Sequence, residues 1–116
     1  MNKTRRRSVC PISCTLDILG DKWSLVLVRD LFAGKTRFNE FAQSPERIAS
    51  NILADRLERL ERHGVIASKP SAQREGSLTY TLTPKGRALY PVLQAIGQWG
   101  LTHIRGTEAR VQLPAG

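Results

Sequence analysis

Apolar residues recur at helical spacing along most of the chain, and glycine and proline mark where the pattern stops. Pro11 suits a first helical position, because its missing N–H has no partner there. Asp21 is expected to cap the next helix with its carboxylate, and Ser44-Pro45 is expected to end a later one. The spacing predicts helices at residues 11–19, 22–32, 38–43 and 49–63.

A different pattern follows residue 64. Residues 65–69 and 78–82 are predicted to be strands, and in the second one apolar residues alternate with threonines. The polar residues 70–77 form a turn between them. Thr83-Pro84 is typical of a helix start, and this last helix is expected to run to Ile104.

A short extended piece is also expected around Thr36. The resulting order is helix, helix, short strand, helix, helix, strand, loop, strand, helix. It predicts a mainly helical fold with a small β-hairpin wing, which is the winged helix-turn-helix plan. The 116 residues suffice for a single compact domain, expected at 10–105. The flanking stretches 1–9, which is basic, and 106–116 are expected to be flexible tails.

The charge of the chain narrows the choice of partner. Lysine and arginine number 18 against 10 acidic residues, which gives a net charge of +8. A strongly basic small domain is typical of nucleic-acid binding, although membranes and acidic proteins also attract such chains. The sequence contains no apolar run long enough for a membrane span and no signal peptide, so we expect a cytosolic protein without a membrane partner.

Several blocks in order resemble the HxlR-type winged-helix regulators of bacteria, and together they cover about residues 10–104. One departure concerns the approach to the fourth helix, where many relatives have Gly-Ile-Ser and this chain has Arg47-Ile48-Ala49; the capping role is expected to shift to Ser50. The matching blocks are CPISCTLDILGDKW at 10–23, RFNEF at 37–41, NILADRLERLERHGVI at 51–66 and YTLTPKGRAL at 80–89.

The resemblance implies a fold and a function. It implies double-stranded DNA as a partner, a homodimer whose interface is formed largely by the terminal helices, and regulation of nearby genes. It also implies that small aromatic molecules, oxidants or electrophiles act as effectors in many relatives, in some through a cysteine near the position of Cys10.

The fourth predicted helix is the candidate recognition helix. Its apolar stripe leaves Ser50, Asn51, Ala54 and Asp55 facing away from the core near its N-terminal end, which is the part that enters a major groove. Asn51 can pair with adenine, and Asp55 can accept from cytosine. The alternative is that Ser50 and Asn51 only cap the helix. For Arg56, an internal ion pair and a phosphate contact remain equally open.

Two other places carry candidate phosphate contacts. Arg37 and Asn39 stand at the start of the third helix. Arg74 lies near the tip of the predicted wing, where an arginine can enter a narrow minor groove, and Lys69 and Gln73 are weaker candidates beside it. The alternatives are an ordinary surface arginine and a solvated hairpin tip.

The cysteines do not form a metal site with the scattered histidines, so we expect no metal and no cofactor. Cys10 directly precedes Pro11, and a thiolate at a helix start is stabilised by the helix dipole and free N–H groups. Two interpretations of Cys10 are left open: a sensor of oxidants or electrophiles, and a small structural residue in a dimer interface. Cys14 is expected to pack.

The last helix has more apolar residues than one small domain needs, and apolar residues of the first helix can join them. We expect them to form a two-fold dimer interface. The predicted interface residues are Leu16 and Leu19 in the first helix, and Leu89, Val92, Leu93, Ile96 and Trp99 in the last.

These observations favour a sequence-specific transcriptional regulator, expected to act as a repressor on a palindromic operator. The alternative is a winged-helix interaction module that binds protein or RNA. We expect no enzyme, because the sequence offers neither a nucleophile with a matched base nor a metal set.

Overall fold

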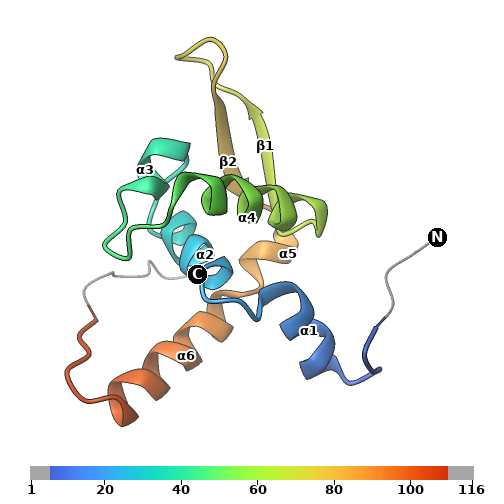
Figure 1. Cartoon of the computed structure of the whole chain (residues 1–116), viewed down its shortest axis with the longest axis vertical. Helices are drawn as coiled ribbons and strands as arrows, with labels where there is room; N and C mark the ends of the chain where they lie inside the picture. The colour runs from blue at the N-terminus through green and yellow to red at the C-terminus, as the bar shows by residue number, and fades with distance from the viewer. Residues whose placement is uncertain (1–5, 110–116) are drawn as a thin grey trace.

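The structure is a computed structural model that describes residues 6–109 (Figure 1). The hairpin projects from one side of the molecule, whereas α1 and α6 diverge on the other. The helices are α1 (Pro11–Leu19), α2 (Ser24–Phe32), α3 (Phe38–Ala42), α4 (Ser50–Arg62), α5 (Pro84–Arg87) and α6 (Tyr90–His103), and the strands are β1 (Ile66–Pro70) and β2 (Leu78–Leu82). The predicted mainly helical, winged helix-turn-helix fold is confirmed.

The strands β1 and β2 pair antiparallel, with Ile66 opposite Leu82 and Pro70 opposite Leu78. The extended piece expected around Thr36 joins this hairpin. Arg37 forms a single bridge with Thr79, and the Tyr80 N–H donates to the Thr36 carbonyl at 2.8 Å. The wing is therefore attached to the segment that leads into α3, which fixes the orientation of one relative to the other.

The core lies where α2, α3, α4 and the base of the hairpin meet. Phe41 from α3 is fully buried and meets the Tyr80 ring edge-on, with 6.1 Å between the ring centroids. Each fully buried side chain of this size contributes about 1.5–3 kcal/mol to folding, so the apolar stripe of α4 alone holds the recognition helix firmly. The buried apolar residues of the centre are Leu27, Val28, Phe41, Leu53, Leu57, Leu60 and Ile66.

The regular second helix begins later than predicted, at Ser24 rather than Lys22, and its N-cap residue is Trp23. Asp21 caps the turn that leads into it. Its carboxylate accepts from the N–H groups of Trp23 (3.0 Å) and Ser24 (3.1 Å) and from the Ser24 hydroxyl (2.6 Å). The residues between Asp21 and Ser24 form a turn before the regular helix starts.

The prediction of one long final helix is wrong, because the helix is interrupted after Arg87 and resumes at Tyr90. Pro91 explains the break. It has no N–H to donate to the Arg87 carbonyl, and its ring crowds the preceding turn, so it is accommodated only in the first turn of a new helix. Pro91 was the available signal in the sequence.

The short helix α5 is held tightly against the start of β1. Thr83 caps it by accepting from the Gly86 N–H at 3.1 Å, and Lys85 donates to the His63 carbonyl at 2.7 Å, at the end of α4. Gly86 is buried, and a Cβ at this residue would lie 2.1 Å from the Val65 carbonyl oxygen. The sequence Thr-Pro-Lys-Gly thus anchors the wing to α4.

None of the helices in residues 6–109 is long and apolar enough to cross a membrane.

Candidate nucleic-acid interface

The exposed face of α4 carries the side chains that the sequence predicted to read DNA. Ser50, Asn51, Ala54 and Asp55 are all exposed, whereas Leu53, Leu57 and Leu60 on the opposite face are buried. The helix therefore presents a polar N-terminal surface on a rigid apolar base, which is the arrangement required for insertion into a major groove.

The start of α4 differs from the expectation. Ala49 is the N-cap residue in extended conformation, and Ser50 is already the first helical residue. The expected capping role of Ser50 is therefore wrong. The methyl group of Ala49 cannot accept a hydrogen bond, and Ser50 is one residue too late to cap the helix. The Ser50 hydroxyl is free of that task.

Arg56 is used inside the protein. Its Nε donates to Asp21 Oδ2 at 2.9 Å, and its Nη1 also binds the neighbouring Asp55 carboxylate. The sequence left open an internal ion pair or a phosphate contact for Arg56. In the structure Arg56 forms the internal ion pair, which links α4 to the turn before α2. Asp55 is thereby partly occupied, so less of its carboxylate is left to accept from a base than the sequence suggested.

This link affects the charge of Asp21. Burial opposes ionisation of its carboxyl, but the hydrogen bonds from Ser24, Arg56 and the backbone outweigh burial and lower the pKa of Asp21 to about 2. Asp21 is therefore ionised at neutral pH and serves as a common anchor for the start of α2 and the middle of α4.

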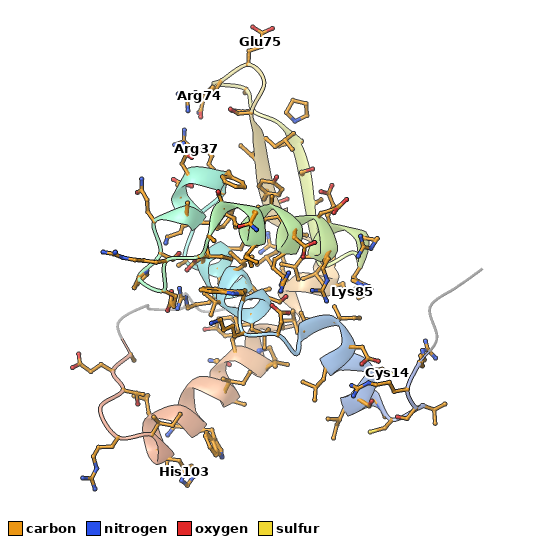
Figure 2. All side chains as sticks on the ribbon, viewed as in Figure 1. Cys14, Arg37, Arg74, Glu75, Lys85 and His103 are labelled. Atoms are coloured by element: carbon orange, nitrogen blue, oxygen red, sulfur yellow. The ribbon has the colours of Figure 1, made fainter. Side chains whose placement is uncertain are left out.

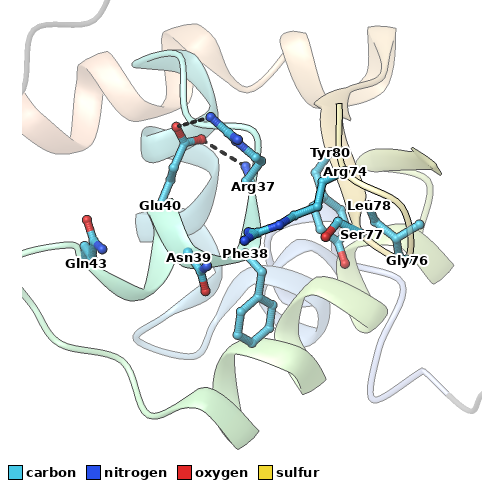
Figure 3. A pocket seen from close by; sticks show the side chains of 10 residues that line it. All are labelled: Arg37, Phe38, Asn39, Glu40, Gln43, Arg74, Gly76, Ser77, Leu78 and Tyr80. Atoms are coloured by element: carbon cyan, nitrogen blue, oxygen red, sulfur yellow. Dashed lines mark hydrogen bonds and ion pairs between the residues drawn. The ribbon is translucent and has the colours of Figure 1, made fainter. Parts of the chain in front are cut away.

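A cavity of about 460 Å³ separates α3 from the wing. Arg37 and Asn39 line it from α3, and Arg74 lines it from the wing loop. Figure 3 shows the Arg74 side chain extending from the wing toward Phe38 and Asn39. Two arginines that are far apart in the chain thus line one cavity, and both lie at the end of the molecule where the wing projects (Figure 2).

Arg37 is positioned by the start of α3. The Glu40 carboxylate accepts from the N–H groups of Thr36 (2.8 Å) and Arg37 (3.0 Å), and these hydrogen bonds lower the pKa of Glu40. Glu40 also lies 3.9 Å from the Arg37 guanidinium. That pair is exposed, so its strength is small, and a phosphate can compete with Glu40 for Arg37.

Hydrogen bonds within the wing loop hold its conformation. The Ser71 hydroxyl accepts from the N–H groups of Gln73 and Arg74, both at 3.2 Å, and the Ser71 N–H donates to Ser77 at 2.8 Å. Gly76 adopts a φ of +82°, which favours glycine. Lys69 and Gln73 are exposed beside Arg74, so all three predicted wing residues are accessible.

A polar network that the sequence did not predict connects the end of α2 with the loop before α4. Asp30 is buried, and its carboxylate binds the Ser44 hydroxyl and Arg29, the latter at 2.8 Å. Arg29 also donates to Glu46 at 2.7 Å, which lowers the pKa of Glu46, and Lys35 donates to Ser44 at 3.0 Å. The signal was available, because Asp30 lies three residues after Leu27 on the core face of α2.

The network joins the end of α2 to the loop that precedes α4. Because that loop leads into the recognition helix, the network holds the approach to α4 against the end of α2. Its members thereby position the DNA-reading surface without forming part of it.

The terminal helices carry the remaining candidate residues. Cys10 is exposed at the start of α1, and Cys14 donates to the Ser8 carbonyl through its sulfur at 3.3 Å. Arg7 folds back to bind Asp17 at 2.6 Å, so the part of the N-terminal tail from residue 6 contacts α1. Among the described residues, no group of acidic, cysteine and histidine side chains is arranged to hold a metal ion.

The structure divides the predicted dimer residues into two groups. Leu19 and Leu93 belong to the domain's own core, and Leu89 packs against it. Leu19 and Leu93 are buried and not available to a partner, whereas Leu89 is half-buried. The exposed members are Leu16 (52%), Val92 (40%), Ile96 (50%) and Trp99 (61%).

A helix-turn-helix with an exposed polar recognition face, a basic wing and arginines at one end defines the class of winged-helix DNA-binding proteins. Residues 18–108 match the family model described as HxlR-like helix-turn-helix. The chain belongs to this family, and it is a DNA-binding transcriptional regulator.

Individual relatives agree with this assignment. The chain is 42% identical over 91 residues to an uncharacterized HTH-type transcriptional regulator, YdeP, of Bacillus subtilis, covering 78% of this chain and 71% of YdeP. The crystal structure of the putative transcription factor PA1607 has a TM-score of 0.81 and 45% identity, covering 93% and 75% of the two chains. The redox regulator HypR in its oxidized form has a TM-score of 0.73 and 34% identity, covering 80% and 96%.

Proposed function

We propose that the protein is a homodimeric repressor that binds an operator with two-fold symmetry. Each protomer inserts α4 into a major groove and lays its wing against the neighbouring backbone. Such a dimer places its recognition helices about 34 Å apart, one turn of B-DNA. Repression follows where the operator overlaps a promoter, since the bound dimer then blocks the polymerase.

The observation that carries the dimer is the apolar surface of α1 and α6. Trp99 is 61% exposed and Ile96 is 50% exposed, and Ile12 and Leu16 on α1 are exposed as well. Large apolar residues gathered on the surface mark an interaction site. Figure 1 shows α1 and α6 diverging on the side opposite the wing, so a partner bound there leaves α4 and the wing free for DNA.

The positions of the side chains on the DNA-binding surface indicate which of them read bases and which bind the backbone. Asn51 is exposed in the first turn of α4, where a bidentate amide can read adenine, and Ser50 beside it can bind a base or a phosphate. Arg37, Asn39 and Arg74 surround the cavity between α3 and the wing, which suits them to the sugar–phosphate backbone.

The test begins with selection of bound duplexes from a random pool by the purified protein, which is expected to yield a palindrome. On that operator, Asn51→Ala should lose about 1–3 kcal/mol of discrimination at one base pair per half-site. Arg74→Ala should weaken cognate and non-cognate duplexes alike and reduce the salt slope by about 0.9 per protomer.

The matched control is Glu58→Ala, an exposed residue further along α4, which should leave base preference unchanged. Equal effects of Asn51→Ala and Arg74→Ala on specificity and salt dependence would contradict this assignment of roles. A selection that yields no palindrome would contradict binding as a symmetric dimer.

A second candidate function is control of DNA binding by the Cys10 thiol. The observation that favours it is the exposure of Cys10 at the beginning of α1, next to the proposed interface. A thiolate there can add to the carbon of a quinone, and the adduct would then separate helices that must pack in the dimer. The similarity to HypR, described as a redox regulator, supports this proposal.

The experiment treats the DNA complex with a quinone or with diamide and measures release. Wild-type protein and Cys14→Ser should be released, whereas Cys10→Ser should stay bound. If Cys10→Ser is released as readily as the wild type, the thiol of Cys10 is not the trigger and its role is structural.

A further inference from the structure

Arg47 has an unusual backbone conformation. Its φ is +58°, and within residues 6–109 it is the only residue other than glycine with a positive φ. An L-residue is disfavoured there because its Cβ crowds the following carbonyl oxygen, and arginine is not among the residues that tolerate this region well. A glycine would adopt this conformation without the penalty.

The loop, rather than the arginine side chain, imposes this conformation. Ser44 and Ile48 are both buried, and they anchor the chain on either side of Arg47. The Arg47 N–H donates to the Ser44 carbonyl at 3.0 Å, which closes a tight turn between the two anchors. The backbone must therefore reverse at this position whichever residue occupies it.

The side chain of Arg47 contributes nothing visible to the fold. It is exposed, and among the described residues its guanidinium forms no hydrogen bond or ion pair. The acidic neighbour Glu46 is already paired with Arg29. Arg47 thus places an unpaired guanidinium at a strained backbone position that glycine would adopt more easily. Backbone strain of this kind is concentrated at functional sites.

The position of Arg47 indicates its use. It lies three residues before Ser50, so its Cα is within about 10 Å of the first residue of the recognition helix. When the first turn of α4 enters a major groove, the loop before it meets the backbone at the groove edge. A guanidinium there binds phosphate oxygens in a bidentate geometry.

We propose that Arg47 is a positioning residue that binds a DNA phosphate beside the major groove and sets the depth and angle of α4. This assignment rests on the proposed docking of α4. The phosphate contact is made only in the complex with DNA, whereas the strain of the Arg47 backbone is present with or without DNA.

The test uses Arg47→Gly and Arg47→Asn in the full chain, because both substitutes tolerate a positive φ. For each variant, urea unfolding measures stability, and fluorescence anisotropy measures binding to a mixed-sequence duplex of about 30 base pairs at several salt concentrations. The control is Arg105→Gln, which removes the same charge from an exposed site after α6.

We expect the two measurements to change in opposite directions. Arg47→Gly should raise the folding equilibrium constant about fivefold by relieving strain. It should weaken duplex binding about tenfold at low salt and reduce the salt slope by about 0.9 per protomer. Arg105→Gln should keep the wild-type slope.

Three results would overturn the proposal. If Arg47→Gly and Arg47→Asn keep the wild-type affinity and salt slope, Arg47 does not bind phosphate, even though the wild type still binds DNA and the proposed function stands. If both variants lose stability and binding together, the residue has a structural role. A wild-type protein that does not bind duplex would overturn the docking of α4 and this proposal together.

Discussion

At the residue scale, one arginine side chain holds α4 in place, and one glycine without a side chain lets α5 pack closely. Arg56 appears on a helical wheel as a candidate for DNA, yet Asp21 and Asp55 bind it within the protein. Gly86 looks unremarkable in sequence, yet the backbone of Val65 passes where its Cβ would stand. Both roles depend on residues distant in the chain.

Gly86→Ala is expected to destabilise the protein by about 1–3 kcal/mol. Its Cβ would lie 2.1 Å from a backbone carbonyl oxygen, which cannot move aside as a flexible side chain can. Urea unfolding measures the change. The matched control is Gly97→Ala in the middle of α6, where a Cβ meets nothing within 4 Å; it should be neutral or stabilising by about 0.5–1 kcal/mol. Equal stability of the two variants would contradict the close packing of α5 on β1.

At the scale of elements, polar links hold the helices at fixed angles. Asp21 joins the start of α2 to α4 through Arg56, and Asp30 joins the end of α2 to the loop before α4 through Ser44. The recognition helix is thus connected to both ends of α2. Its apolar stripe supplies most of the packing energy, and these links specify its direction.

The Asp21 link predicts a pH dependence. The folded pKa, about 2, lies below the ordinary value of 3.8. The stabilisation is therefore complete above about pH 4 and is lost as the pH falls toward 2. Asp21→Asn should be less stable than wild type by about 1 kcal/mol at neutral pH, and the difference should shrink through this window. Urea unfolding between pH 2 and 7 measures it. A constant difference across the range would show that ionised Asp21 does not stabilise the fold.

At the scale of the whole molecule, the two ends have separate tasks. Arg37 and Arg74 lie at the wing end, whereas Cys14 on α1 and His103 on α6 lie at the other (Figure 2). The apolar residues left exposed are concentrated on the helices of the second end. This separation allows a dimer to form without covering the DNA-reading surface.

Trp99→Glu is expected to convert the proposed dimer to monomers at micromolar concentration, because a carboxylate would be buried without a partner. Sedimentation velocity measures the change, and operator affinity should fall with it. The control is Gln98→Glu, which adds the same charge on another face of α6, where Gln98 donates to Thr102. A wild type that sediments as a monomer, or a Trp99→Glu dimer, would contradict the proposed interface.

The sequence by itself determined the order of elements, the buried stripe of α4 and the exposure of Ser50, Asn51 and Arg74. These features depend on local periodicity and on turn residues, which adjacent positions encode. The sequence also contains two further indications of structure. Pro91 indicates the break before α6, and Asp30 on the apolar face of α2 indicates a buried polar network.

Only the tertiary structure decided the pairing of Arg56, the joint cavity of Arg37 and Arg74, the core position of Leu19 and Leu93, and the positive φ of Arg47. Each depends on segments that approach through space, or on a loop stretched between two buried anchors. Local sequence patterns do not encode these contacts, because the packing of the whole core brings the distant segments together.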